Sequence, residues 1–301
     1  MANIRIVTDS ATDMPQSVKD RYPEVIIIPL TVVTDDGRLL DDEVEITSKE
    51  VCDAVREGKV YKTTQVIPDR FREVFEECVK RGESVIYVGF SSGLSGTVQS
   101  GRVGAELVKE EYPDADITVI DTLCASFGFG MVVMRAAELV RKGLPKEKVV
   151  EGIEFYAQHQ EHVFSVDKLL YLRRGGRISG FSAFVGDTLN IKPVMDREDG
   201  KLIPRYKERG HKRAMQRIVE MVRQKSLNSD ISHQIIGINH SDCYEFVTEL
   251  EQMLTEQLGV QQYIESVIGS VISCHTGPGT ISMYFVNAWP EDPELIVLKG
   301  E

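Results

Sequence analysis

The residues best suited to binding chemistry lie in one short turn, Gly89 to Thr97, whose sequence is GFSSGLSGT. The β-branched and aromatic run before it, Val85 to Val88, predicts a buried parallel strand, and the polar residues after it predict a helix from about Thr97. Glycines let a ligand approach the backbone closely, and the free N–H groups at a helix start attract an anion. The turn therefore predicts a binding site for a small anion, although an ordinary strand-to-helix turn with capping hydroxyls has a similar composition.

Two further loops carry side chains that could contact the same anion. Thr63 and Thr64 precede a predicted helix, as does the turn from Gly89 to Thr97, which we call the serine turn. The hydroxyls of the two threonines could share one carboxylate with the hydroxyls of the serine turn. Because a hydrogen bond to a charged group contributes about 1.5–3 kcal/mol, such a pair orients a head group without binding it tightly. His275 lies in a Gly-Pro-Gly loop, where it could donate to an anion, orient a hydroxyl or be purely structural.

A serine hydrolase is the alternative from a different functional class. Residues Gly89 to Gly93 match G-x-S-x-G, the nucleophile elbow, with Ser91 as the nucleophile. That mechanism needs a histidine base and an upstream oxyanion loop, yet the first histidine in the chain is His159. His275, oriented by Asp242 or another acid, is a candidate base late in the chain.

The composition excludes some classes of function. The net charge of −12 argues against a nucleic-acid-binding face, which needs a basic surface. Five scattered cysteines form no CxxC or Cys/His cluster, so we predict no metal site and a reducing compartment. The first residues enter a strand pattern without a signal-peptide core, and no apolar run is long enough to span a membrane. We therefore expect a cytoplasmic protein that uses no cofactor and binds no nucleic acid.

Three arginines stand out against this acidic background. Arg173, Arg174 and Arg177 lie within five residues, in the segment LRRGGRI. Such a run is most often a solvated face with a few ion pairs. It is also suited to docking an acidic partner or phosphates, because the guanidinium fork matches their oxygens.

The order of predicted elements indicates an α/β protein. Strands and helices alternate over residues 1–157, which is typical of a parallel sheet with helices on both faces. The order then changes, with a hairpin signal at Glu198-Asp199-Gly200, so we predict a second, mixed-sheet α/β domain over residues 158–301. Finer expectations are one strand over Val25–Val33 bent at Pro29, a helix capped by Asp13, and a strand over Tyr263–Ser273. Thr47 and Glu50 also predict a capping box at the start of a short helix that runs through Arg56.

Several segments together resemble the DegV family, the fatty-acid-binding subunits of the bacterial fatty acid kinase. The turn from Ser91 to Thr97 matches the family's SSGLSGT residue for residue. Further matches, in the family's order and spacing, are Ile6–Ser10, Lys62–Pro68, Leu172–Ile178 and His275–Gly279. The chain departs from the pattern at Thr64, Val66 and Ile67, where the family usually has Ser, Pro and Ser.

The resemblance implies a long-chain fatty acid buried between the two domains of a protein that has no catalytic set of its own. Its carboxylate would be bound mainly by Thr63 and Ser95. The supporting residues would be Ser92, Thr64, His275 and Asp9. A helix over Phe129–Arg141, which contains Met131 and Met134, could line the tunnel for the tail or simply form core.

The resemblance also implies a partner. Arg173, Arg174 and Arg177 would help present the head group to an ATP-dependent kinase subunit, which phosphorylates the acid to an acyl phosphate. The resemblance is also consistent with transient contact between this protein and a membrane.

Overall fold

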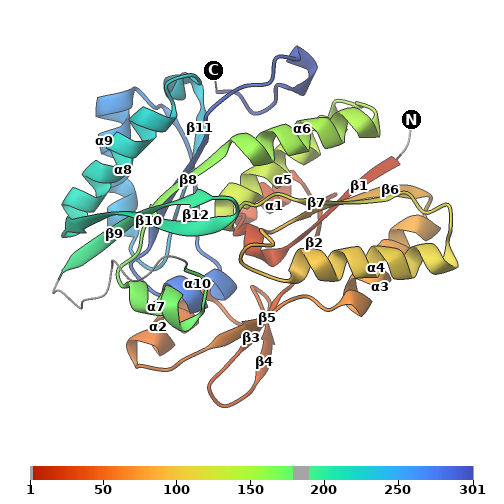
Figure 1. Ribbon diagram of the computed structural model, residues 1–301, viewed down its shortest axis with the longest axis horizontal. Helices are drawn as coiled ribbons and strands as arrows, with labels where there is room; N and C mark the ends of the chain where they lie inside the picture. Colours follow the sequence, from red (N-terminus) through yellow and green to blue (C-terminus); the bar gives the residue numbers. More distant parts are fainter. Residues whose placement is uncertain (1–2, 179–189, 301) are drawn as a thin grey trace.

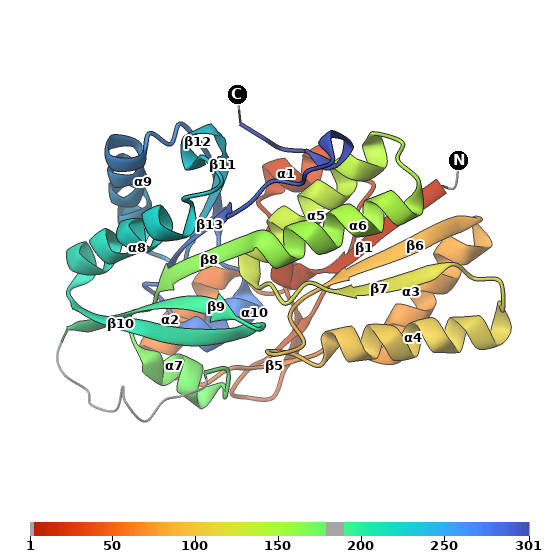
Figure 2. The same ribbon diagram turned by 45° about the horizontal axis from the view of Figure 1, so that its top comes forward.

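The computed structural model describes residues 3–178 and 190–300, whose strands form three sheets (Figure 1). The first sheet is parallel, in the order β2-β1-β6-β7. Its central strands are apolar because helices cover both faces, with α3 and α4 on one side and α5 and α6 on the other (Figure 2). These elements are β1 (Asn3–Asp9), β2 (Ile26–Ile28), β6 (Glu83–Gly89), β7 (Ile117–Asp121), α3 (Pro68–Lys80), α4 (Thr97–Glu111), α5 (Ser126–Arg141) and α6 (Lys146–His159).

The second sheet is mixed and has the order β10-β9-β8-β13-β11-β12. The predicted hairpin is confirmed: β9 and β10 are antiparallel, and Asp199 and Gly200 at its tip both have positive φ. Helices α8 and α9 pack on this sheet. The elements are β8 (Gln160–Ser165), β9 (Ile191–Glu198), β10 (Lys201–Arg209), β11 (Ile235–His240), β12 (Gln262–Val267), β13 (Ile281–Val286), α8 (His211–Lys225) and α9 (Tyr244–Leu258).

A small antiparallel sheet, β4-β3-β5, lies below the parallel sheet in Figure 1. Near it α2 and α7 pack against α10, and α2 begins with the predicted capping box of Thr47 and Glu50. The remaining elements are β3 (Thr31–Val33), β4 (Leu39–Asp41), β5 (Lys62–Thr64), α1 (Gln16–Arg21), α2 (Ser48–Arg56), α7 (Leu169–Arg174), α10 (Ser270–Thr276) and the 3₁₀ turns η1 (Ser10–Thr12), η3 (Ile231–His233) and η4 (Pro293–Leu295).

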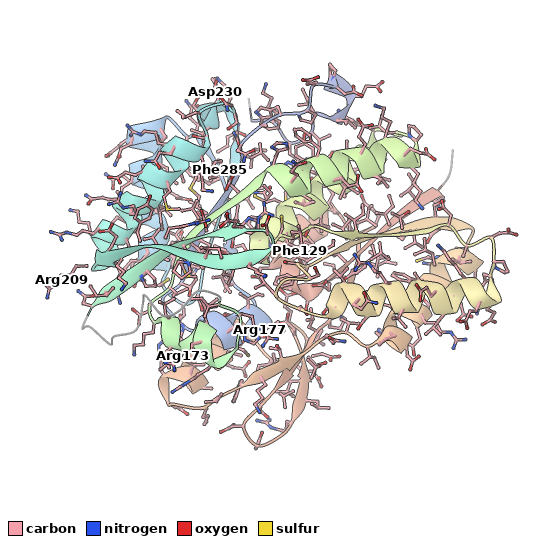
Figure 3. The ribbon with its side chains drawn as sticks, viewed as in Figure 1. Phe129, Arg173, Arg177, Arg209, Asp230 and Phe285 are labelled. Atoms are coloured by element: carbon pink, nitrogen blue, oxygen red, sulfur yellow. The ribbon has the colours of Figure 1, made fainter. Side chains whose placement is uncertain are left out.

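Helix α5 contacts both large sheets. It contacts β1 of the parallel sheet and β8, β11 and β13 of the mixed sheet. Its residues Phe127 to Ala137 are buried all round, as expected for a helix with apolar neighbours on every side. Phe129, labelled in Figure 3, lies near the middle of the molecule.

The structure confirms the predicted fold class, a mixed α/β protein with a parallel N-terminal sheet and a mixed C-terminal sheet. The chain passes from α6 directly into β8 at His159–Gln160. The domain boundary at residues 157/158 stays a prediction.

Three expectations about single elements were wrong. Residues 25–33 form two strands in different sheets, because the segment breaks at Pro29, which has no N–H to give to a ladder. Asp13 ends η1 in the left-handed region, and Pro15 occupies the N-cap of α1 instead. The strand expected over Tyr263–Ser273 stops at Val267, and a helix, α10, begins at Ser270.

Candidate functional site

A cavity of about 210 Å³ lies where the serine turn, β5, α7 and α10 meet. Its apolar wall includes Leu30, Phe90, Leu94, Leu172, Leu202 and Ile272. Its polar wall is formed by Thr63, Thr64, Gln65, Ser95, Thr97, Arg177, His275 and Thr276. The lining residues thus come from both the N-terminal and the C-terminal parts of the chain. The cavity combines an apolar lining with a small set of hydroxyls, as binding pockets for amphipathic ligands do.

Thr63 and His275 meet at the polar wall from opposite ends of the sequence. Thr63 lies in the middle of β5, where pairing with Val32 of β3 fixes its position. His275 lies in the last turn of α10, and its Nε2 is 2.8 Å from Thr63 Oγ1. The structure therefore brings these two predicted residues into direct contact, although His275 is on a helix and not in a loop that follows a strand.

Burial keeps the His275 imidazole neutral at physiological pH. Desolvation lowers its pKa to about 4, and the nearby Arg177 guanidinium contributes in the same direction. Space around the ring is tight, because a Cβ added at Gly175 would lie 2.4 Å from His275 Nδ1. Only glycine at that position allows α7 to approach the ring this closely.

Ser95 faces the cavity from the serine turn. Its Oγ lies 2.9 Å from Thr97 Oγ1 and accepts a hydrogen bond from the Thr97 N–H at 3.3 Å. The serine turn also packs closely against the segment Thr63–Gln65, because a Cβ added at Gly96 would lie 2.1 Å from Gln65 Oε1. Gln65 in turn donates to Ser100 Oγ of α4 at 2.8 Å, which fixes the two loops relative to each other.

Two of the predicted supporting residues lie away from the cavity wall. Ser92 is exposed, and its N–H donates to Asp121 Oδ1 at 3.1 Å. Asp9 is buried one layer behind the wall, where it accepts from the Ala11 N–H and the Tyr87 hydroxyl. Burial raises the pKa of Asp9 to about 6.

The arginine run continues from the cavity to the surface. Arg177 lines the cavity and donates to the carbonyls of Leu94 and Gly175. Arg174 and Arg177 also line a second cavity of about 220 Å³, which we call the vestibule. Its other lining residues are Val55, Lys59, Val60, Tyr61, Lys62, Thr63, Tyr171, Gly175, Cys274 and His275. Arg173, labelled in Figure 3, is exposed on α7. It is not among the residues that line either cavity.

The geometry around Ser91 does not favour a nucleophile. Ser91 is 0% exposed, and its hydroxyl donates to the Gly200 carbonyl at 2.7 Å. The same oxygen accepts from the Gly93 N–H at 3.2 Å. Within the part of the chain that the structure describes, no histidine is hydrogen-bonded to Ser91, so the base that the hydrolase reading requires is missing. Ser91 instead ties the serine turn to the tip of the β9–β10 hairpin.

Sequence reasoning missed most of the apolar wall. Leu30 reaches the cavity from between β2 and β3, Leu172 from α7 and Leu202 from β10. No local pattern assigned these three side chains to a cavity wall. Met131 and Met134 are buried in α5 and do not line the cavity, so they belong to the core. Gln65 and Thr276 were detectable in principle, because each adjoins a predicted polar residue.

Two general findings hold for residues 3–178 and 190–300. No helix there is long and apolar enough to cross a membrane. No group of three or more His, Cys, Asp or Glu side chains there is arranged to hold a metal ion. The fold and the cavity define an α/β protein with an amphipathic pocket where the serine turn, β5, α7 and α10 meet.

Comparison with known proteins places the chain in a family. A family model described as "Uncharacterised protein, DegV family" matches residues 3–288. The chain is 37% identical over 289 residues to a DegV domain-containing protein of Clostridium perfringens, an alignment that covers 95% of this chain and 98% of that protein. The chain belongs to the DegV family.

Solved structures of relatives have the same fold. A DegV family protein from Thermus thermophilus, described for its fatty acid binding, is 36% identical with a TM-score of 0.84 over 94% of this chain and 98% of its own. DegV from Bacillus subtilis, described as a fatty acid binding protein, is 26% identical with a TM-score of 0.82 over 94% of this chain and 99% of its own.

Proposed function

We propose that this chain binds a long-chain fatty acid in the cavity and holds the carboxylate with Thr63 and Ser95. The observation that carries the proposal is the convergence of hydroxyls from β5 and the serine turn on one side of an otherwise apolar cavity. The solved relatives described as fatty acid binding proteins support the same ligand class. Thr64 and His275 are supporting residues, while Asp9 acts from behind the wall by capping η1.

The neutral His275 has a specific role in this proposal. If its Nε2–H donates to Thr63 Oγ1, the threonine hydroxyl proton is free to donate to a carboxylate oxygen. The histidine thereby orients the hydroxyl without adding a charge. Among the residues that the structure describes, Arg177 is the one guanidinium on the wall of the main cavity, so it supplies the positive charge that balances the carboxylate.

Affinity and orientation come from different parts of the ligand. Each methylene removed from water contributes about 0.8 kcal/mol, so an acyl tail of about fourteen methylenes gives roughly 11 kcal/mol before the costs of association. The hydroxyls contribute less, and they determine that the carboxylate lies at the polar wall.

In this proposal the protein is a carrier and not an enzyme. A separate kinase subunit, docked near Arg173, Arg174 and Arg177, transfers the γ-phosphoryl group of ATP to a carboxylate oxygen, which releases ADP and leaves an acyl phosphate on the carrier. Exposure of Arg173 and Arg174 on α7 beside the cavity supports this location for docking.

The proposal is tested by comparing palmitate with its methyl ester in a binding titration. The two ligands share a tail, so they differ mainly in the charged head group. We expect palmitate to bind at least about tenfold more tightly, because the ester loses charge-assisted hydrogen bonds. Equal affinity for acid and ester, or no uptake of either, would contradict the proposal.

A further inference from the structure

Two buried carboxyl groups lie behind the apolar side of the main cavity, and the proposed carboxylate site uses neither of them. They belong to Asp13, which follows η1, and Asp42, which follows β4, and each residue is 1% exposed. In the part of the chain that the structure describes, no cation is paired with either group. Burying carboxyl groups without a cation is costly unless hydrogen bonds compensate, so their bonding partners indicate what they do.

Asp42 connects three segments that contribute to the apolar wall. It accepts hydrogen bonds from the Ser10 hydroxyl at 2.6 Å and from the Ser270 hydroxyl at the start of α10. Ser10 Oγ in turn accepts from the Leu30 N–H at 3.0 Å. Leu30 lines the cavity, and so do the residues that follow Ser10 and Ser270 in the chain. The Asp42 carboxyl therefore holds η1, Leu30 and α10 at fixed positions relative to one another.

Asp13 connects α10 to α5. It accepts from the Gly269 N–H at 2.9 Å and from the Ser126 hydroxyl, and Ser126 Oγ accepts from Asn239 Nδ2 of β11 at 2.8 Å. Asp13 and Ser126 both have left-handed backbone, with φ of 48° and 51°. Residues with a side chain keep such a conformation only where the surrounding contacts fix it, and such strain is typical of switch regions. The bond between these two strained residues is one of those contacts.

These bonds also separate the main cavity from the surface. A groove of about 560 Å³ lies on their other side. Gly269 and Ser270 line the groove, whereas the next two residues of α10, Val271 and Ile272, line the cavity. Apolar residues on the groove wall are Met14, Pro15, Ile46 and Val267. A shift of the first turn of α10 away from η1 and α5 would therefore join the cavity to the groove.

The two carboxyl groups do not ionise together easily. Burial raises the pKa of Asp42 and raises that of Asp13 well above its ordinary value, and the charge of Asp42 adds to the shift at Asp13. Asp42 has more donors, because N–H groups of α10 also bond to it, so it carries the negative charge while Asp13 keeps the proton. Lys19 of α1 is paired with Glu43. The other titratable groups that face the pair are all acids, namely Asp9, Glu43, Cys274 and Tyr284.

We propose that Asp13, Asp42 and their hydroxyl and N–H partners form a clasp that holds α10 against η1 and α5, and that loss of the last proton from the clasp opens the apolar side of the cavity to the groove. The inference rests on the proposed function, because the molecule that passes is the fatty acid. It adds two positioning residues that control ligand exchange through α10, away from the carboxylate site.

The sign of the pH effect follows from the proton on Asp13. The folded chain binds this proton more tightly than the unfolded chain does. The stability linked to Asp13 is therefore complete below the ordinary pKa of 3.8 and is lost as pH rises through the raised value. Rising pH charges both carboxyl groups, and their repulsion opens the clasp. Exchange should then become faster in both directions, because an open gate helps entry and exit alike.

The test measures association and dissociation of cis-parinarate, a fluorescent fatty acid, by stopped flow from about pH 5.5 to about pH 8.5. In the unaltered chain we expect both rate constants to rise by about tenfold or more, while the dissociation constant changes less than about threefold. Asp13→Asn keeps the side-chain shape, suits the left-handed backbone and has no proton to lose, so its rates should vary less than about twofold. Comparing the proteins at each pH cancels the ionisation of the ligand itself.

Two further variants complete the design. Asp42→Ala removes the bonds to Ser10 and Ser270, so it should exchange the ligand fast even at the lowest pH. Asp20→Asn removes an exposed carboxylate of α1 outside the clasp and should behave as the unaltered chain does. Hydrogen exchange of the α10 amides in the ligand-free protein is an independent readout. At high pH it should be faster in the unaltered chain than in Asp13→Asn.

Several results would overturn the inference. One is a set of rates in the unaltered chain that do not change with pH, and another is a rise that persists in Asp13→Asn. A rise abolished only by Asp9→Asn would assign the effect to Asp9. A dissociation constant that grows in step with the dissociation rate would show a weakened fold and no gate. If the unaltered chain binds neither cis-parinarate nor palmitate, the proposed function fails, while hydrogen exchange of α10 still decides whether the clasp opens with pH.

Discussion

At the residue scale, the proposal depends on which serine of the turn faces the ligand. We expect Ser95→Ala to weaken palmitate binding by about tenfold or more, since a hydrogen bond to a charged group contributes about 1.5–3 kcal/mol. Ser92→Ala is the matched control, because Ser92 lies in the same turn but is exposed to solvent. Isothermal titration of both variants measures the difference. Equal losses, or a larger loss in Ser92→Ala, would place the head group elsewhere.

A second prediction concerns the protonation of His275. Its folded pKa of about 4 lies below the ordinary value near 6.5, so the unfolded chain binds the proton first as pH falls. The stability linked to His275 is therefore complete above about pH 6.5 and is lost progressively toward pH 4. Nitrogen NMR of the ligand-free protein should show a neutral imidazole at pH 5.5, assigned with His275→Gln. A titration midpoint near 6.5 would contradict the account.

At the element scale, the contact between the serine turn and the β9–β10 hairpin explains Ser91. Ser91→Ala removes the hydrogen bond to the Gly200 carbonyl and should reduce the free energy of unfolding by about 1 kcal/mol. Chemical denaturation measures this change, again with Ser92→Ala as the control. We also expect no labelling of Ser91 by a fluorophosphonate. Specific labelling would revive the hydrolase alternative.

The elements that local chemistry specifies were predictable from the sequence. The capping box at Thr47 and the Asp199-Gly200 hairpin each need only neighbouring residues, and both were predicted correctly. The run from Tyr263 to Ser273 was misread because its apolar residues suit a strand, whereas the break near Gly269 depends on tertiary contacts. Gly269 donates its N–H to the buried Asp13 carboxylate at 2.9 Å, a contact between residues far apart in the chain.

At the scale of the whole molecule, the polar wall was more predictable than the apolar one. Thr63 and Ser95 follow from loop composition and from the tendency of ligands to bind beyond the carboxyl ends of parallel strands. Leu172 and Leu202 enter the cavity only because α7 and β10 lie over the serine turn in the folded chain. The position of Leu202 on β10 depends on how the mixed sheet packs on α5, and no local pattern reports that packing.

The most direct test of the central claim is native mass spectrometry of the purified protein, followed by denaturing release and identification of any bound molecule. The account predicts a co-purified fatty acid at about one per chain, or stoichiometric uptake of added palmitate, because the buried tail provides most of the affinity. A protein that is empty and also fails to take up added fatty acid would contradict the account.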